Sequence, residues 1–272
     1  MKYGFGVDLG GTTVKIAFFD ETGLMLEKWE IPTVTANGGS RILPDIAASI
    51  RQFIAQRTLD TADLIGVGIG VPGPVSNKGV VNKCINLGWG VFNIAQQLSD
   101  LVELPVKAGN DANVAALGEY WKGGGKGCDN MVFVTLGTGV GGGIVIEGHL
   151  LHGAHGSGAE IGHLCINTEE TVRCNCGNYG CVEQYCSATG IVRLAKLYLE
   201  NSDAPSTLKG VENLTCKDIF DAAKAEDASA IAILDQVYAY MGEFLGNICS
   251  TVNPEMVVIG GGVSKAGQML HF

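Results

Sequence analysis

A strand, a glycine turn and a second strand occur twice in this sequence, and no other feature restricts the fold as much. The first copy spans Tyr3–Asp20 and turns at Gly10-Gly11, and the second spans Met131–Glu147 and turns at Gly137-Thr138-Gly139. Neither copy fits a Walker A loop or a dinucleotide fingerprint, because both of those motifs need a helix after the turn. Two copies of one hairpin indicate a duplicated α/β domain that holds a nucleotide between its halves.

The first hairpin carries the residue types that bind a polyphosphate with its metal. The paired glycines Gly10 and Gly11 expose backbone N–H groups to phosphate oxygens. Asp8 is a candidate ligand of hydrated Mg²⁺, and Lys15 would place positive charge near the phosphates. An ordinary β-hairpin with Gly-Gly in its turn remains the alternative for this copy taken alone.

A third glycine cluster, Gly260–Gly262, follows the predicted strand Met256–Ile259. A helix is predicted from Ser264 onward. Glycine backbone without side chains can approach a flat purine ring or a phosphate closely. This cluster is therefore a further candidate for nucleotide binding.

The segment from His163 to Glu183 contains a pattern typical of metal binding. Cys174, Cys176 and Cys181 follow His163 at Cys-X-Cys-Gly-X-X-Gly-Cys spacing. Three thiolates and one imidazole form a closed tetrahedral set that suits structural Zn²⁺. The alternatives are a disulfide pair or buried apolar thiols. The chain has nine cysteines, an odd number, with no signal peptide and no long apolar run, so a cytoplasmic protein with a metal site is favoured.

Composition excludes some classes of partner. The net charge of −10 disfavours binding to nucleic acid, because an acidic surface repels phosphates. No apolar run is long enough to predict a membrane span. A chain of 272 residues can bury a large core, and we predict two α/β domains over residues 1–118 and 119–272.

Residues between and after the hairpins alternate between strand and helix patterns. Asn110-Asp111 stands where a short strand ends and a helix begins. Asn and Asp are common helix N-caps, and position alone does not separate that role from a general base. Before Asn110, we predict helices over residues 42–56 and 92–101 and strands over 64–71 and 106–109. After it, we predict helices over 187–200, 216–225 and 228–252.

Taken in order, these motifs resemble a known family. They are Asp8-X-Gly10-Gly11-Thr12-X-X-Lys15, Asn110-Asp111, Leu136-Gly137-Thr138-Gly139-Val140-Gly141-Gly142-Gly143, Glu160-X-Gly162-His163, and the cysteine segment ending at Glu183. The chain resembles the ROK family of repressors, open reading frames and sugar kinases, most closely its bacterial glucokinases. The resemblance implies the actin-like ATPase fold, a duplicated ribonuclease H-like fold of two α/β domains with a cleft between them.

The resemblance also implies roles for individual residues. Asp111 corresponds to the catalytic base and also to a sugar contact. The other sugar contacts correspond to Asn110, Glu160, His163 and Glu183. The zinc ligands correspond to His163, Cys174, Cys176 and Cys181. Contacts to ATP correspond to Asp8, Gly10, Gly11, Thr12, Lys15, Thr138, Gly139 and, in the adenosine loop, Gly261.

The activity that the resemblance implies is phosphorylation of the 6-hydroxyl of glucose by ATP with Mg²⁺, in a cytoplasmic homodimer. An N-acetylmannosamine or N-acetylglucosamine kinase is the alternative within the enzymes. Outside them stand a sugar-responsive regulator and a zinc-stabilised sugar-binding protein without catalysis. Regulators of this family carry an N-terminal helix-turn-helix, whereas this chain enters its first strand at Tyr3. Relatives usually continue past the apolar end Gln268–Phe272, so we expect a truncated chain.

Overall fold

The computed structural model describes residues 1–270, and it divides into two compact units. Unit 1 contains residues 1–118 and 150–159, and unit 2 contains residues 119–149 and 160–272. His271 and Phe272, the last of the apolar run named above, lie outside the described residues. The predicted division into domains over residues 1–118 and 119–272 stays a prediction.

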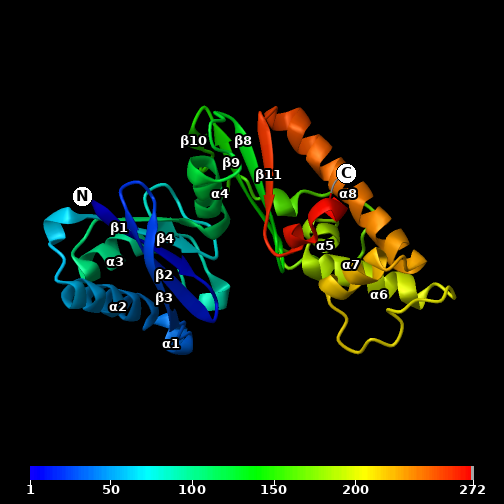
Figure 1. Cartoon of the computed structure of the whole chain (residues 1–272), viewed down its shortest axis with the longest axis horizontal. Helices are drawn as coiled ribbons and strands as arrows, with labels where there is room; N and C mark the ends of the chain where they lie inside the picture. Colours follow the sequence, from blue (N-terminus) through cyan, green and yellow to red (C-terminus); the bar gives the residue numbers. More distant parts are fainter. Residues whose placement is uncertain (271–272) are drawn as a thin grey trace. The chain divides into compact units, whose positions relative to one another are not determined.

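Unit 1 is built on a five-stranded sheet in the order β3-β2-β1-β4-β7 (Figure 1). The three strands β1 to β3 run antiparallel, while β1, β4 and β7 are parallel. The bounds are β1 Tyr3–Leu9, β2 Thr13–Asp20, β3 Met25–Pro32, α1 Ala36–Gly39, α2 Ile42–Arg57, η1 Thr61–Asp63, β4 Leu64–Val71, β5 Val80–Val81, η2 Ile85–Leu87, β6 Phe92–Asn93, α3 Ile94–Val102, β7 Val106–Asn110 and α4 Asp111–Lys122.

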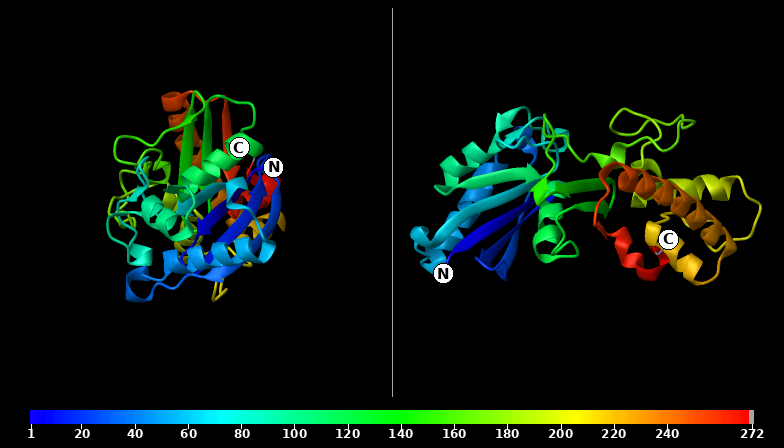
Figure 2. Two further views of the ribbon diagram at one scale, coloured as in Figure 1. Left: turned by 90° about the vertical axis from the view of Figure 1, so that its left-hand side faces the viewer. Right: turned by 90° about the horizontal axis from the view of Figure 1, so that it is seen from above.

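Unit 2 is built on the sheet β10-β9-β8-β11, in which β8 pairs antiparallel with β9 and parallel with β11. Figure 2 shows β11 beside the two green strands β8 and β9. The bounds are β8 Met131–Leu136, β9 Val140–Ile146, β10 His149–Leu150, η3 Ile161–His163, α5 Glu183–Cys186, α6 Ala188–Glu200, α7 Cys216–Lys224, α8 Ala228–Val252, β11 Met256–Gly260 and η4 Val263–Leu270.

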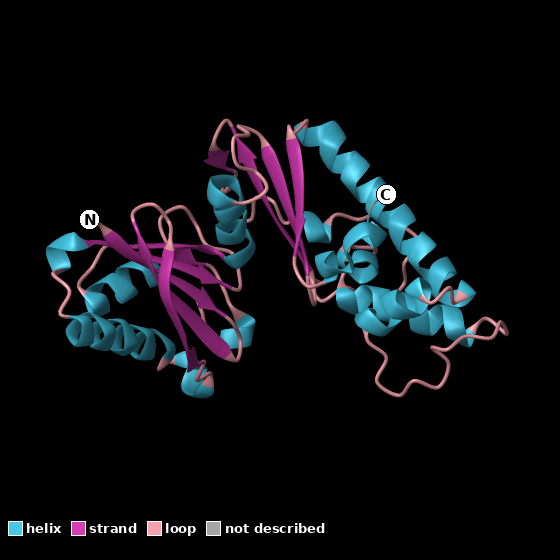
Figure 3. Ribbon diagram, in the orientation of Figure 1, coloured by secondary structure: helices cyan, strands magenta, loops and turns pink. Residues whose placement is uncertain are grey.

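The repeated hairpin has the same surroundings in both units. In unit 1, β1 lies between an antiparallel partner, β2, and a parallel partner, β4. In unit 2, β8 lies between the antiparallel β9 and the parallel β11. Figure 3 shows that each sheet is accompanied by its own helices. The mixed α/β architecture with two sheets agrees with the fold class predicted from the sequence.

The core of unit 1 lies between the sheet and helices α2 and α3. Alternate residues of β1 and β2 point into it, among them Phe5 and Phe18, while the helices contribute apolar faces that include Phe53. Trp29 of β3 stacks on Phe53 with ring centroids 4.7 Å apart and donates its indole N–H to Ser49 Oγ at 2.8 Å. This contact explains how β3 joins the sheet.

Several elements differ from the sequence prediction, among them β3, α3 and η4. Strand β3 was not predicted, because most of its residues alternate only between half-buried and exposed. The helix predicted over 92–101 begins at Ile94, since Phe92 and Asn93 form β6 and Asn93 Oδ1 caps the helix by accepting from Gln96 N–H at 2.9 Å. The helix predicted after Gly262 is a 3₁₀ segment, η4, interrupted at Gly267.

Two further features concern the whole described chain. Helix α8 is the longest helix and places a continuous apolar stripe, including Phe244 and Met241, against its neighbours in unit 2. Over residues 1–270, none of the helices combines the length and the apolar character that crossing a membrane requires.

Candidate active site

The side chains of Asn110 and Asp111 make different hydrogen bonds at the junction of β7 and α4. Asn110 Oδ1 accepts from the N–H of Asn113 at 3.2 Å, which is the bond of an N-cap residue. The Asp111 carboxylate accepts from the adjacent N–H of Ala112 at 2.8 Å. Because Asn110 already caps the helix, the carboxylate of Asp111 is not needed for that purpose.

The surroundings of Asp111 favour its protonated form more than water does. Burial raises the pKa of the Asp111 carboxyl, and the negative charge of Asp8 adds to this, while the bond from Ala112 N–H opposes it. The residue nevertheless keeps an exposed edge through which a substrate can reach it. A carboxylate with a raised pKa and an open edge is suited to accept a proton.

The first glycine hairpin presents exposed backbone. Gly10 N–H bonds to Thr13 O at 3.0 Å and Gly10 O accepts from Thr33 Oγ1 at 2.8 Å, so the turn is fixed on both sides. Gly11 and Thr12 are exposed. Asp8 and Lys15 lie opposite each other in the β1–β2 register and form an exposed ion pair of 3.5 Å.

The second hairpin is tied to the segment that carries the cysteines. The carboxylate of Glu183 accepts from Val140 N–H at 3.0 Å, and a side chain at Gly139 would meet that carboxylate at 2.2 Å. The turn is also fixed at the start of α6, where Thr189 Oγ1 donates to Thr138 O at 2.7 Å. A side chain at position 139 would therefore displace the carboxylate of Glu183 from its bond to Val140 N–H.

The four predicted metal ligands lie together in unit 2. The ligand atoms of His163, Cys174, Cys176 and Cys181 all fall within 4.8 Å of one another. The sulfurs of Cys176 and Cys181 are 3.6 Å apart, and Cys174 Sγ is 3.9 Å from His163 Nδ1. Tetrahedral Zn–S bonds of about 2.3 Å require separations of roughly 3.8 Å, so the arrangement fits a zinc site.

The chemistry of the cluster agrees with a bound cation. Burial and the neighbouring thiols raise the pKa values of Cys174 and Cys181, so the thiols alone resist ionisation. A divalent cation would compensate the charge of several thiolates at once. Gly180 lets the loop close, because its φ is +67° and a side chain there would meet Asn167 O at 1.9 Å.

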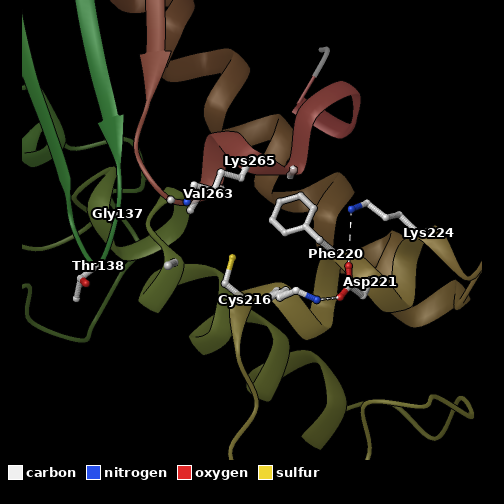
Figure 4. Close-up of a pocket in the computed structure, with 12 residues that line it drawn as sticks. Gly137, Thr138, Cys216, Phe220, Asp221, Lys224, Val263 and Lys265 are labelled. Atoms are coloured by element: carbon white, nitrogen blue, oxygen red, sulfur yellow. Dashed lines mark hydrogen bonds and ion pairs between the residues drawn. The ribbon is translucent and has the colours of Figure 1, made fainter. Parts of the chain in front are cut away.

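A cavity of about 530 Å³ opens beside the second hairpin, at the carboxyl ends of the parallel strands β8 and β11. Crevices at this edge of parallel strands commonly bind nucleotides. Gly137 and Thr138 form one side, and Cys216 and Phe220 of α7 form another (Figure 4). Gly261, with φ of +90°, passes so close to Leu136 that a side chain would meet its carbonyl oxygen at 2.4 Å.

Positively charged side chains outnumber negatively charged ones around the cavity. Asp221 forms ion pairs with Lys217 and, at 3.7 Å, with Lys224. Lys265 of η4 also lines the cavity and has no ion-pair partner among residues 1–270. In Figure 4 its side chain points toward Val263, on the side where Gly137 and Thr138 lie. Burial raises the pKa of Cys216 to about 11, so that thiol stays neutral near pH 7.

The sequence profile of the ROK family matches residues 4–272. The chain belongs to the ROK family. A glucokinase from Halalkalibacterium halodurans is 45% identical over 269 residues, which cover 97% of this chain and 82% of that protein. The fold is thus that of ROK proteins, and the mixed α/β architecture and the His-Cys₃ cluster agree with it.

Solved ROK structures give the same result. A ROK family glucokinase from Streptomyces griseus in complex with glucose and AMPPNP has a TM-score of 0.77 at 32% identity, covering 98% of this chain and 86% of that one. A ROK family transcriptional regulator, a homologue of the E. coli Mlc protein, has a TM-score of 0.86 at 28% identity, covering 99% of this chain and 67% of that one. Both kinds of ROK protein therefore share this fold.

Sequence motifs identified only some of the residues around the 530 Å³ cavity. Thr138 lines it and Gly261 shapes its edge, as their place in glycine turns indicated. Cys216, Phe220 and Lys265 line it without any recognisable motif. In the sequence, only their positions mark these residues. Cys216 and Phe220 lie in α7, an amphipathic helix, and Lys265 lies in η4, which directly follows the third glycine cluster.

Proposed function

We propose that this ROK protein is a glucokinase that transfers the γ-phosphoryl group of ATP to the 6-hydroxyl of glucose. The observation that carries the proposal is the pair Asn110-Asp111, in which the amide caps α4 and leaves a carboxylate of raised pKa for chemistry. The 45% identity to a glucokinase and the likeness to a structure in complex with glucose and AMPPNP support the same activity.

Asp111 acts as the general base in this proposal. Its carboxylate accepts the proton of the primary hydroxyl as the hydroxyl oxygen attacks the γ-phosphorus in line, and the bond to the β-phosphate oxygen breaks. Proton removal by a positioned base contributes roughly 10²–10⁴-fold to rate. Asn110, Glu160, His163 and Glu183 bind other hydroxyls of the sugar.

Nucleotide binding is assigned to the glycine turns and to the cavity. Backbone N–H groups of Gly10, Gly11, Thr12 and Gly139, with the hydroxyl and backbone of Thr138, hold the phosphates. The adenosine part occupies the 530 Å³ cavity, whose volume is in the range of small-molecule sites, about 300–1,000 Å³. Asp8 would hold a hydrated Mg²⁺, which would supply positive charge to the phosphates. Lys15 adds positive charge nearby.

Zinc has a structural role in this proposal. His163, Cys174, Cys176 and Cys181 would supply four protein ligands, which leaves no open position for a reacting water. Because Nδ1 of His163 faces the cluster, Nε2 is the ring nitrogen that remains for a sugar hydroxyl.

A coupled assay of ADP release over a panel of hexoses tests the proposal. Glucose should give the highest kcat/KM. The acetamido group of an amino sugar such as N-acetylmannosamine adds bulk and changes the pattern of hydrogen-bond donors next to carboxylates that accept from hydroxyls. A higher kcat/KM for N-acetylmannosamine would make the protein an amino-sugar kinase. No ADP release with any hexose would reject the kinase assignment.

A further inference from the structure

The segment between His163 and Cys174 is held by a second group of side chains that does not include the metal ligands. Glu170 stands at its centre, and its side chain is only 9% exposed. One carboxylate oxygen accepts from Tyr185 Oη at 2.6 Å and forms an ion pair with Arg193, and the other accepts from Val172 N–H at 2.9 Å. We call Glu170, Tyr185 and Arg193 the Glu170 anchor.

The anchor joins the loop to three helices. Tyr185 belongs to α5, Arg193 belongs to α6, and the ring of Tyr185 packs on Tyr240 of α8 with centroids 4.2 Å apart. The Arg193 guanidinium lies over the Tyr185 ring at 5.3 Å. Asn167 Nδ2 adds a further bond to Tyr185 Oη at 3.0 Å. The loop is therefore fixed to a packed helical scaffold.

The anchor acts on the same short helix that carries a proposed sugar ligand. Helix α5 is only four residues long, Glu183–Cys186, so Tyr185 and Glu183 move together. The residue between them, Gln184, accepts from Cys181 N–H at 3.1 Å and donates to Val172 O at 2.9 Å. A shift of Tyr185 would thus be passed to the Glu183 carboxylate and to its bond with Val140 N–H.

The ion pair between Glu170 and Arg193 is partly exposed, so it is a weak source of stability, but it is a geometric constraint. What the pair does provide is one defined arrangement, because Glu170 has three donors at fixed directions. The metal ligands constrain the other part of the loop and also meet α5, because Cys181 N–H donates to Gln184 and Cys174 Sγ lies 3.8 Å from Glu183 Oε1.

We propose that Glu170, Tyr185 and Arg193 are positioning residues for sugar binding. They fix the orientation of α5, and through it the carboxylate of Glu183, in addition to the contacts that the metal ligands make with this helix. This inference rests on the proposed kinase function. It adds to that function a set of residues that touch neither sugar nor nucleotide.

The test compares Glu170→Gln and Tyr185→Phe with the wild-type chain. Glu170→Gln keeps the shape but removes the charge that pairs with Arg193, and Tyr185→Phe removes one hydroxyl from a buried ring. We expect KM for glucose to rise about tenfold in each, the loss of a hydrogen bond to a charged group being of that order. KM for ATP should change less than about twofold, and the zinc content per chain should not change.

Arg193 supplies the rescue. Arg193→Met should raise KM for glucose as Glu170→Gln does, whereas Arg193→Lys keeps the charge and should recover part of the affinity. Asp45→Asn serves as a control, because it removes an ion pair on the surface of α2, far along the sequence from the proposed site. That variant should match the wild type.

Four results would overturn the inference. KM for glucose that stays at the wild-type value while the thermal midpoint falls would make the anchor purely structural. Loss of zinc from Tyr185→Phe, which changes a single hydroxyl, would mean that the anchor acts through the metal. A wild-type chain that phosphorylates no hexose would reject the proposed function and this inference with it, whereas an active wild type with unaffected variants would reject the anchor alone.

Discussion

At the scale of single residues, the structure separates two neighbours that look interchangeable in the sequence. Asn110 accepts from the Asn113 N–H and so ends β7 and starts α4. Asp111 comes directly after it, beside the negative charge of Asp8, and burial raises its pKa. The helix thus positions a carboxylate that it does not need for capping.

Asp111→Asn should reduce kcat by about 10²–10⁴-fold, because an amide keeps the shape of the side chain but cannot accept a proton. Glucose binding, measured by calorimetry, should remain close to that of the wild type. Near-normal turnover by the variant would mean that another group removes the proton.

The pH dependence follows from the same carboxyl. Because the pKa of Asp111 is raised, the base form is lost at a higher pH than for an ordinary aspartate. The kcat of the wild type should therefore fall as the pH decreases through this raised pKa, and rise to a plateau above it. A wild-type kcat that stays level down to the usual pKa of aspartate would contradict the assignment.

Lys265 gives a prediction at the nucleotide site. It is the lysine of the cavity without an ion-pair partner among the described residues, so its charge is available to the phosphates. Lys265→Ala should raise KM for ATP about tenfold and leave KM for glucose unchanged, as expected for loss of a charge-assisted hydrogen bond. Lys196→Ala, an exposed lysine of α6 outside the cavity, is the control. Equal KM values for the two variants would exclude a role for Lys265.

At the scale of elements, the loop between η3 and α5 has almost no regular structure, yet proposed sugar contacts stand at both of its ends, His163 in η3 and Glu183 in α5. Two isolated bridges, Cys165 with Cys181 and Arg173 with Tyr179, and a few further hydrogen bonds pair its backbone. The four metal ligands and the Glu170 anchor add side-chain contacts that hold its shape. Burial opposes ionisation of Glu170, but bonds from Tyr185 and Val172 N–H and the charge of Arg193 together lower its pKa.

Cys176→Ala should reduce the zinc content, measured by elemental analysis, from about one ion per chain to well below that value. Because structural zinc contributes directly to folding, the thermal midpoint should fall and KM for glucose should rise together. Cys249→Ala, an exposed cysteine of α8 outside the cluster, should change neither quantity. Freshly purified wild-type protein that contains no zinc would refute the site itself.

At the scale of the whole molecule, two sheets carry the same arrangement of a central strand between an antiparallel and a parallel neighbour. The cavity proposed for the nucleotide is nevertheless lined by unit 2 alone. Its walls come from the turn after β8, the start of α6, α7, η4 and the turn before η4, segments that are far apart in the sequence.

AMPPNP should therefore slow amide hydrogen exchange most strongly in residues 137–140, 216–224 and 260–266. At a concentration about 100 times Kd, the ligand should stabilise the fold by about 2.7 kcal/mol. Exchange in α2 and α3 serves as the internal reference, since these helices belong to the core of unit 1. Protection confined to α2 and α3 would contradict the placement of the nucleotide.

The sequence alone determined the features that depend on short spacing. Strands Leu64–Val71 and Met131–Leu136 and helix Ala228–Val252 agree with their predicted bounds, because a buried strand or an amphipathic helix repeats a local pattern. The ligand set His163, Cys174, Cys176 and Cys181 was also readable, since its spacing is itself the signal.

Only the tertiary structure decided the features that depend on contacts across the chain. Strand β3 pairs with β2, and its Trp29 stacks on Phe53, whereas its own residues alternate only between half-buried and exposed. Lys265 reaches the cavity because β8 and β11 are neighbours, and Glu170 meets Arg193 although the two residues lie 23 positions apart in the sequence. Spacing along a chain specifies which residues can share a face, whereas the free energy of packing selects which faces meet.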